Sequence, residues 1–338
     1  MKRLRRLLRT ASYRSGALSL ARTRLRRALT VVMLHRVMDP ADPDFAQADP
    51  EFTLSTSLFD QLLGFFVRHY AVVSLDDVMR AREGVRPLPD HALLITFDDG
   101  WADNLRYAAP LLKERGLPAA IFAAAEPILS ASKAWWQEQV FAAARAGVLD
   151  DWLANHADRD SLAMTGNNSA GALALVVRLG RMAEPERSAM LAGLPAAPCQ
   201  ARMMLEPKEL LQLAAYGIAL GIHGFTHLPL TEIADVEGDL GRARAAIAAS
   251  SAGTAVTEAL SLPHSRCNDA VIAAASAAGI KLIFTGDMNL ERTSGGMLPP
   301  RPTLGRINIK GSYMARGRDR DRLDPAAAAR WLWDRRQV

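Results

Sequence analysis

The stretch ALLITFDDG, residues 92–100, runs from an uninterrupted apolar segment into two adjacent aspartates and a glycine. A short apolar run that ends at a turn signal predicts a strand buried on both faces, here over 92–97. Gly100 lets the chain turn sharply away from the end of that strand. In folds built on parallel strands, functional side chains gather at the carboxyl ends of the strands. Asp98 and Asp99 are therefore the first candidates for chemistry.

Strand-like and helix-like segments alternate along most of the chain, which predicts an α/β fold with a parallel sheet or barrel. We expect further strands over 29–34, 71–74, 119–124, 218–222, 259–262, 281–285 and 306–309. Helices are expected over 57–70, with Ser57 as its N-cap, and over 75–82, 104–115, 207–216, 236–250, 269–278 and 325–335. The alternation stops at about 130–203, an Ala- and Leu-rich stretch that we interpret as a helical insertion.

The composition is that of a globular chain with a sizeable core. Its 338 residues are 49% hydrophobic and 23% charged, which argues against a largely disordered or collagenous protein. Two cysteines, Cys199 and Cys267, are too few for a disulfide framework or a cysteine-rich zinc site. The sequence holds no uninterrupted apolar stretch of the ~20 residues that a membrane-spanning helix needs.

Basic residues are concentrated at the N-terminus, where residues 1–38 hold eleven arginines and lysines and no acid. We interpret 1–28 as a basic arm and 29–338 as the catalytic domain. Leu4, Leu7, Leu8 and Ala11 have helical spacing, so the arm either lies on an anionic membrane surface or packs on the body. The arm lacks the aromatic residues of a nucleic-acid platform, and no nucleic-acid partner is expected. Arginines interrupt any apolar block of a signal peptide, so the expected location is the cytoplasm, free or at the membrane.

Asp98 and Asp99 repel one another as adjacent carboxylates, and a bound cation would relieve that repulsion. One carboxylate would then bind the metal and the other would serve as a base. The alternative is an ordinary Asp-Gly turn. A second motif, HGFTH at 223–227, follows the expected strand 218–222. Two neutral imidazoles suit zinc and similar ions, and with one carboxylate they make a facial triad, Thr226 being predicted to orient one ring.

The segments TFDDG at 96–100 and HGFTH at 223–227 resemble the hallmarks of the polysaccharide deacetylase family, also called NodB-like or carbohydrate esterase 4. The resemblance extends over about 30–309 and implies a distorted (β/α) barrel of the NodB-homology type. It implies that Asp98 is the catalytic base, while Asp99, His223 and His227 hold one divalent ion. Zinc is the first choice, with cobalt, manganese, nickel and iron as alternatives. The implied reaction removes acetyl groups from N-acetylated sugars of a poly- or oligosaccharide.

Two further segments resemble the circularly permuted poly-N-acetylglucosamine deacetylase branch. MLH at 33–35 is similar to the family's late L-x-H motif moved to the N-terminus, which implies that His35 is the general acid. The alternative is a buried structural histidine. LGRI at 304–307 is similar to an L-P-R-I segment, which implies that Arg306 pairs with Asp98. The alternative is a surface charge on a strand.

One segment departs from the family pattern. Where the family has an aromatic and a glycine after proline, this chain has Pro263-His264-Ser265, and Ser261 stands in place of an arginine. Pro263 and His264 are candidate substrate contacts or plain loop residues. The pair Trp135-Trp136 is interpreted as core packing, with stacking on a sugar as the alternative. An amidase with a non-polysaccharide substrate and a non-catalytic carbohydrate-binding relative remain alternative functions.

Overall fold

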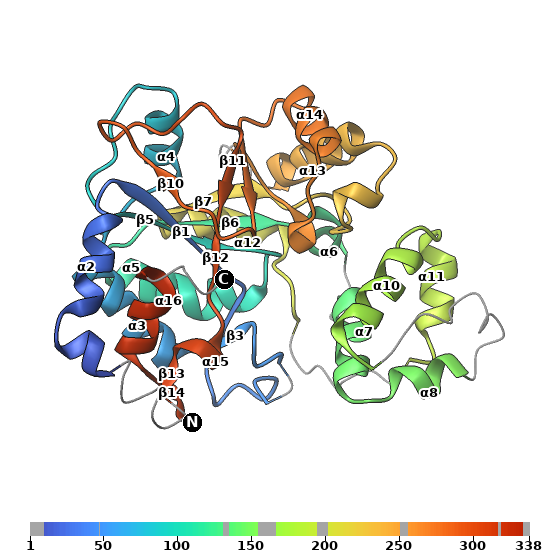
Figure 1. Cartoon of the computed structure of the whole chain (residues 1–338). Helices are drawn as coiled ribbons and strands as arrows, with labels where there is room; N and C mark the ends of the chain where they lie inside the picture. The colour runs from blue at the N-terminus through green and yellow to red at the C-terminus, as the bar shows by residue number, and fades with distance from the viewer. Residues whose placement is uncertain are drawn as a thin grey trace.

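The structure is a computed structural model that describes residues 10–46, 48–130, 135–154, 167–194, 202–250, 256–316 and 319–333. Its centre is a parallel sheet whose strands pair in the order β1, β5, β6, β7, β8, β9 and β11. These strands are β1 (Ala28–Leu34), β5 (Ala92–Phe97), β6 (Ala119–Ala123), β7 (Ile218–Ile222), β8 (Val256–Ser261), β9 (Leu282–Thr285) and β11 (Thr303–Gly305). Figure 1 shows helices packed around this sheet. The predicted α/β class is confirmed.

The segment after β9 brings the sheet round to its first strand. β11 pairs with β9, whereas β12 (Ile307–Asn308), one residue further along, pairs with β1. Because β11 and β12 are adjacent in the chain, they join β9 to β1, and the sheet curls into the expected distorted barrel. Arg306 stands between β11 and β12, where the predicted strand 306–309 is split in two. Short strands β4 (Ala71–Val72) and β10 (Glu291–Arg292) extend the sheet beside β5 and β1.

Helices follow most of the barrel strands, as predicted. They are α3 (Thr56–His69), α4 (Leu75–Arg82), α5 (Ala109–Glu114), α6 (Ala125–Leu129), α12 (Pro207–Ala215), α13 (Val236–Ser250), α14 (Asp269–Ala277) and α16 (Pro325–Trp333). The predicted helix 104–115 opens with one π-helical turn, η1 (Asn104–Ala108), before α5. Short helical turns η2 (Leu230–Glu232), η3 (Pro263–Ser265) and α15 (Gly311–Met314) lie in loops. The apolar faces of most of these helices pack on the barrel and form its main core, whereas α4 packs in a second apolar cluster with strand residues such as Leu29 and Leu94.

The N-cap of α3 is Ser55, and the prediction of Ser57 was wrong. Ser55 has the extended backbone conformation that an N-cap requires, and its side chain accepts a hydrogen bond from the N–H of Leu58. Ser57 already lies in the first helical turn. Ser55 also ends β3 (Thr53–Ser55), which pairs with β2 (Arg36–Met38) in a small sheet that the sequence did not predict. A second small sheet, β13 (Ala315–Arg316) with β14 (Asp319–Leu323), was likewise not predicted.

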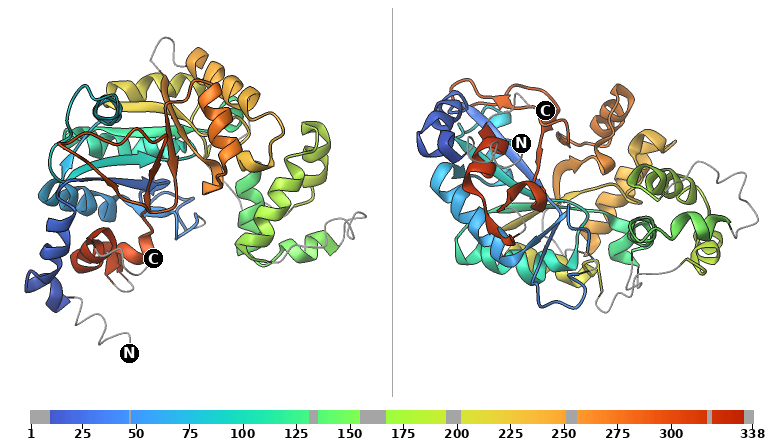
Figure 2. Two further views of the ribbon diagram at one scale, coloured as in Figure 1. Left: turned by 45° about the horizontal axis from the view of Figure 1, so that its top comes forward. Right: turned by 60° about the horizontal axis from the view of Figure 1, so that its bottom comes forward.

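The insertion is helical and projects from one side of the barrel, as Figures 1 and 2 show. Its helices are α7 (Trp136–Arg145), α8 (Leu149–Ala154), α10 (Ser169–Leu179) and α11 (Glu184–Leu191). They enclose an apolar cluster of their own, built from residues such as Val140, Leu175 and Leu179. Leu228, which follows the HGFTH segment, belongs to the same cluster and ties the insertion to the end of β7.

The described part of the N-terminal arm packs on the body. The ring of Tyr13 stacks on Trp333 with centroids 6.4 Å apart, and the guanidinium of Arg22, in α2 (Ala17–Arg24), donates to the carbonyl oxygen of His69. Leu4, Leu7 and Leu8, which define the predicted amphipathic face, lie outside the described residues. Within the described ranges, no helix has the length and apolar character needed to span a membrane.

Candidate active site

Asp98 and Asp99 lie directly after β5, at the carboxyl end of the barrel strands, and both are buried. The backbone of Asp99 has a φ of 76°, and that of Gly100 has a φ of 90°. A positive φ is costly for an aspartate, so surrounding contacts must hold it. One such contact is the indole N–H of Trp101, which donates to Oδ2 of Asp99 over 2.8 Å. The other oxygen, Oδ1, faces the histidines that follow β7.

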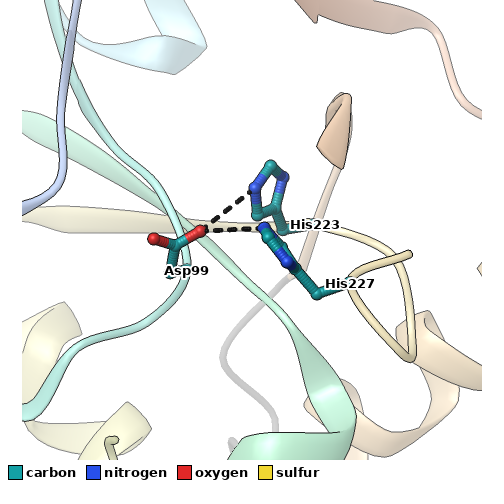
Figure 3. A group of neighbouring side chains, drawn as sticks. All are labelled: Asp99, His223 and His227. Atoms are coloured by element: carbon teal, nitrogen blue, oxygen red, sulfur yellow. Dashed lines mark ion pairs between the residues drawn. The ribbon is translucent and has the colours of Figure 1, made fainter. Parts of the chain in front are cut away.

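The three predicted metal ligands lie together. Oδ1 of Asp99 is 3.3 Å from Nε2 of His223 and 3.1 Å from Nε2 of His227, as Figure 3 shows. One candidate ligand atom from each residue lies within 4.8 Å of the other two, and all three side chains are buried. One carboxylate oxygen and two imidazole nitrogens suit a divalent transition metal. The residues present therefore fit the ion that the sequence implies.

The outer nitrogen of each histidine ring has a specific partner. Nδ1 of His223 is 2.7 Å from the carbonyl oxygen of Ser261, at the end of β8. Nδ1 of His227 is 3.0 Å from Oε1 of Gln137, on α7 of the insertion. The prediction that the Thr226 side chain orients one ring was wrong. Gln137 holds the His227 ring, and the Thr226 hydroxyl instead accepts from the N–H of Leu228. Gln137 was missed because it lies 90 residues from His227 and belongs to no recognisable motif.

Arg306 lies inside the barrel with no exposed surface, so it is not a charge on an exposed strand. Its two terminal nitrogens each donate to one oxygen of Asp98 over 2.7 Å. The remaining donors reach the hydroxyls of Ser261 and Thr96 and the carbonyl oxygen of Thr285. All five guanidinium N–H groups are thus used. The rings of Phe122 and Phe284 lie 5.9 and 5.8 Å from its central carbon.

Ser261 completes this arrangement. Its hydroxyl donates to Oδ2 of Asp98 over 3.0 Å while it accepts from Arg306 over 2.7 Å. At the position where the family pattern has an arginine, the chain therefore has a small hydroxyl. The guanidinium beside Asp98 comes from Arg306 instead.

The charges of the site follow from burial and from these contacts. Burial acts to raise the pKa of Asp98, but the positive charge of Arg306 and the neighbouring His223 ring outweigh it and hold that pKa below its usual value. Burial also acts to raise the pKa of Asp99, but the contacts of its Oδ1 with the His223 and His227 rings outweigh that effect and hold the pKa well below its usual value. Both aspartates are therefore carboxylates at neutral pH.

His35 lies at the end of β1 and lines the same cavity as the two aspartates. Its Nδ1 is buried and has no hydrogen-bond partner in the described part of the chain, and its ring contacts Phe52 at a centroid distance of 4.7 Å. Burial lowers its pKa, against the opposing charges of Asp99 and Asp98. His35 therefore lines the cavity beside the aspartates, and its role as acid stays a prediction.

His264 and Pro263 differ in their access to the cavity. His264 lines the cavity, and its backbone has a φ of 54°. Its ring centroid lies 4.6 Å from that of His227. Burial lowers the pKa of His264 to about 2, so the ring is neutral. Pro263 begins η3 and is not among the described residues that line the cavity. Their roles in substrate binding stay predictions.

The cavity has a volume of about 450 Å³ and lies between the barrel and the insertion. Such a volume is within the range of small-molecule sites. Barrel residues including Asp98, Asp99 and His35 line one part of it. The insertion and the β2–β3 loop supply apolar and charged side chains, namely Trp135, Phe141, Leu173, Phe52, Glu138, Arg145 and Asp49. Trp135 packs between Trp101 and His227, with ring centroids 5.6 and 4.8 Å away, in agreement with a packing role.

The polysaccharide deacetylase family model matches residues 86–283. That range is more than half of the chain, and the chain belongs to the polysaccharide deacetylase family. The predicted family and enzyme class, a polysaccharide N-deacetylase, are confirmed.

Solved structures share the fold. The deacetylase PplD of Streptococcus pyogenes, in complex with acetate, has a TM-score of 0.56 at 15% identity, covering 90% of this chain and 98% of its own. IcaB from Ammonifex degensii has a TM-score of 0.54 at 17% identity, with coverages of 91% and 97%. A de-N-acetylase from Aggregatibacter actinomycetemcomitans has a TM-score of 0.51 at 16% identity, with coverages of 82% and 94%. A comparison with curated proteins gave no match.

Proposed function

We propose that this chain is a metal-dependent hydrolase that removes acetyl groups from N-acetylated sugars of a poly- or oligosaccharide. The observation that carries the proposal is that a buried ion pair and a candidate metal site lie side by side at one cavity. The pair Asp98–Arg306 is bidentate, and the cluster of Asp99, His223 and His227 lies directly beside it. Family membership supports acyl removal from a carbohydrate as the reaction.

Asp99, His223 and His227 would hold one divalent ion, with zinc as the first choice and cobalt, manganese, nickel or iron as alternatives. When bound, the ion would lower the pKa of a water molecule and polarise the acetamide carbonyl. The burial of the three side chains, their mutual closeness and the outward hydrogen bonds of both histidine rings support this ligand set.

Proton transfers belong to Asp98 and His35. Asp98 takes a proton from the attacking water as the new carbon–oxygen bond forms. Arg306 holds both oxygens of that carboxylate in one orientation and keeps it ionised at neutral pH. His35, in its protonated form, supplies a proton to the nitrogen as the carbon–nitrogen bond breaks. The products are acetate and a free amino sugar.

The proposed setting is the biosynthesis of an exopolysaccharide or a glycolipid, with a membrane-surface contact through the basic arm. Arg14, Arg24 and Leu20 of the arm are exposed, which supports contact with an anionic surface. Sedimentation with anionic and neutral vesicles at low and high salt tests this contact. Failure to bind anionic vesicles more strongly than neutral ones at low salt would contradict this contact.

Acetate release from N-acetylglucosamine oligomers and polymers tests the proposed reaction. Bound metal is first removed with a chelator, the protein is then reconstituted with zinc or cobalt, and Asp98→Asn serves as control. Metal-dependent release that the variant lacks is the expected result. Full activity of Asp98→Asn would show that the base is misassigned. Absence of release from a chain that holds one ion would favour a different acyl substrate, or a non-catalytic relative.

A further inference from the structure

The helical insertion supplies a side chain that contacts the metal cluster from outside. Gln137, in the first turn of α7, is only 1% exposed. Its Oε1 lies 3.0 Å from Nδ1 of His227, and its Nε2 donates to the carbonyl oxygen of Thr226 over 2.8 Å. The oxygen and the nitrogen of the Gln137 amide therefore bind two consecutive residues of the HGFTH segment.

These two contacts determine how His227 is protonated. The carbonyl oxygen of Thr226 can only accept, so the amino end of the Gln137 amide must point to it. The amide oxygen then faces Nδ1 of His227, which must carry the hydrogen. The free electron pair of the ring is consequently on Nε2, the atom that faces Asp99 in Figure 3. His223 is set in the same way by the carbonyl oxygen of Ser261, but that contact comes from the barrel.

The insertion also holds the backbone around His227. The φ of His227 is 60°, a conformation that needs support from its surroundings. Leu228, the next residue, packs into the apolar cluster of the insertion. It fits closely against Gly180, because a Cβ at Gly180 would lie 2.5 Å from Cδ2 of Leu228. The loop that carries the second metal histidine is therefore bound to the insertion by a polar contact and an apolar one.

We propose that Gln137 is a positioning residue for His227, and that the helical insertion thereby completes the metal centre. The barrel alone orients His223, whereas the insertion orients His227. The proposal rests on the metal site of the proposed function and is independent of which acyl substrate the enzyme takes. Groups that hold the outer nitrogen of a metal histidine typically contribute 10–100-fold to metal affinity.

The test compares three variants in the full chain. Gln137→Leu removes both hydrogen bonds at similar volume. Gln137→Glu keeps an acceptor for Nδ1 of His227 and loses the donor to Thr226. Gln139→Leu is the matched control, since Gln139 is half-buried on the same helix and lines a different cavity, beside Trp136. Zinc affinity is measured by competition with a chromophoric chelator, and the visible spectrum of the cobalt-loaded protein reports ligand geometry.

We expect Gln137→Leu to bind zinc about 10–100-fold more weakly and to show an altered cobalt spectrum. Gln137→Glu should bind within a few-fold of the original chain, because a carboxylate also accepts from Nδ1. Gln139→Leu should match the original chain in both measurements. Unchanged affinity and spectrum in a folded Gln137→Leu protein would overturn the proposal.

If Gln137→Leu does not fold, Gln137→Glu decides, because a 10-fold or larger loss of affinity in that variant would also overturn the proposal. An equal loss in Gln139→Leu would show that α7 acts through its folding rather than through Gln137. These readouts need no substrate. A chain that binds zinc but releases no acetate would therefore contradict the proposed reaction and leave this inference standing.

Discussion

Asp98 is a buried carboxylate whose charge is stabilised chiefly by one neighbour, Arg306. The Arg306 guanidinium meets both of its oxygens and is itself fully buried. Breaking such a pair leaves an uncompensated charge and costs about 3–5 kcal/mol, far more than an exposed pair would. The same contact sets the pKa of Asp98 below its usual value. The Arg306–Asp98 ion pair therefore contributes both to the free energy of unfolding and to keeping the proposed base deprotonated.

Replacing Arg306 should change the pH profile as well as the stability. In Arg306→Gln the positive charge that most strongly opposes the effect of burial is lost, so the pKa of Asp98 should rise. A base works only when deprotonated, so the acid limb of kcat/KM should move to higher pH. The free energy of unfolding at neutral pH should fall by about 3–5 kcal/mol. An unchanged acid limb in a folded, metal-loaded variant would contradict this role of Arg306.

Asp98 and Asp99 should separate by their effects on metal and turnover. Asp98→Asn keeps the shape of the side chain and should lower kcat by about 10²–10⁴-fold, the usual contribution of a general base, while the ion stays bound. Asp99→Ala should lose ion and activity together, because Oδ1 of Asp99 faces both histidines. Metal content per chain is measured beside acetate release. Loss of the ion from Asp98→Asn would show that the two roles are exchanged.

At the residue scale, the sequence predicted contacts that follow from strand ends. Asp99 and His223 meet because β5 and β7 both end at the same rim of the barrel. Gln137 was not predictable in this way, because only the packing of α7 against the HGFTH loop brings it to His227. The contact of Ser261 with Asp98 was equally hidden, since it depends on where the distant Arg306 lies.

At the scale of elements, burial decides which boundaries can be predicted. β5 and β7 have apolar sequences and closely match the predicted ranges, because parallel strands are covered on both faces. β2 and β3 are three residues each and exist through their mutual pairing, which no local pattern reveals. The break between β11 and β12 at Arg306 likewise has a tertiary origin, since the side chain turns into the barrel to reach Asp98.

The start of α3 offers a direct test of a corrected element boundary. Ser55→Ala removes the side chain that accepts from the N–H of Leu58, so the free energy of unfolding should fall by about 1 kcal/mol. Ser57→Ala is the matched control inside the first turn; it loses only exposed hydrogen bonds, to the carbonyl oxygen of Asp321 and from Gln61, and should cost less than about 0.5 kcal/mol. Chemical denaturation of both variants measures the difference. A larger loss for Ser57→Ala would restore Ser57 as the cap.

At the scale of the whole molecule, the site joins two parts with separate cores. The barrel provides Asp99 and both histidines, and the insertion provides Gln137 and one wall of the cavity. An ion pair crosses the same boundary, from Arg145 on α7 to Asp49 in the β2–β3 loop, with 3.4 Å between nitrogen and oxygen. The family resemblance predicted the barrel, but not that the insertion would share in the site.

Metal removal should therefore destabilise the whole chain and not the site alone. An ion that binds only the folded state stabilises it by about 4 kcal/mol when its free concentration is 1,000 times Kd. Chelation should lower Tm of the original chain and of Asp98→Asn alike, because the proposed ligands remain in both. Asp99→Ala should melt at one temperature with or without chelator, since it has lost a ligand. Calorimetry with and without chelator checks this, and a Tm unaffected by complete removal of the ion would show that binding is not coupled to folding.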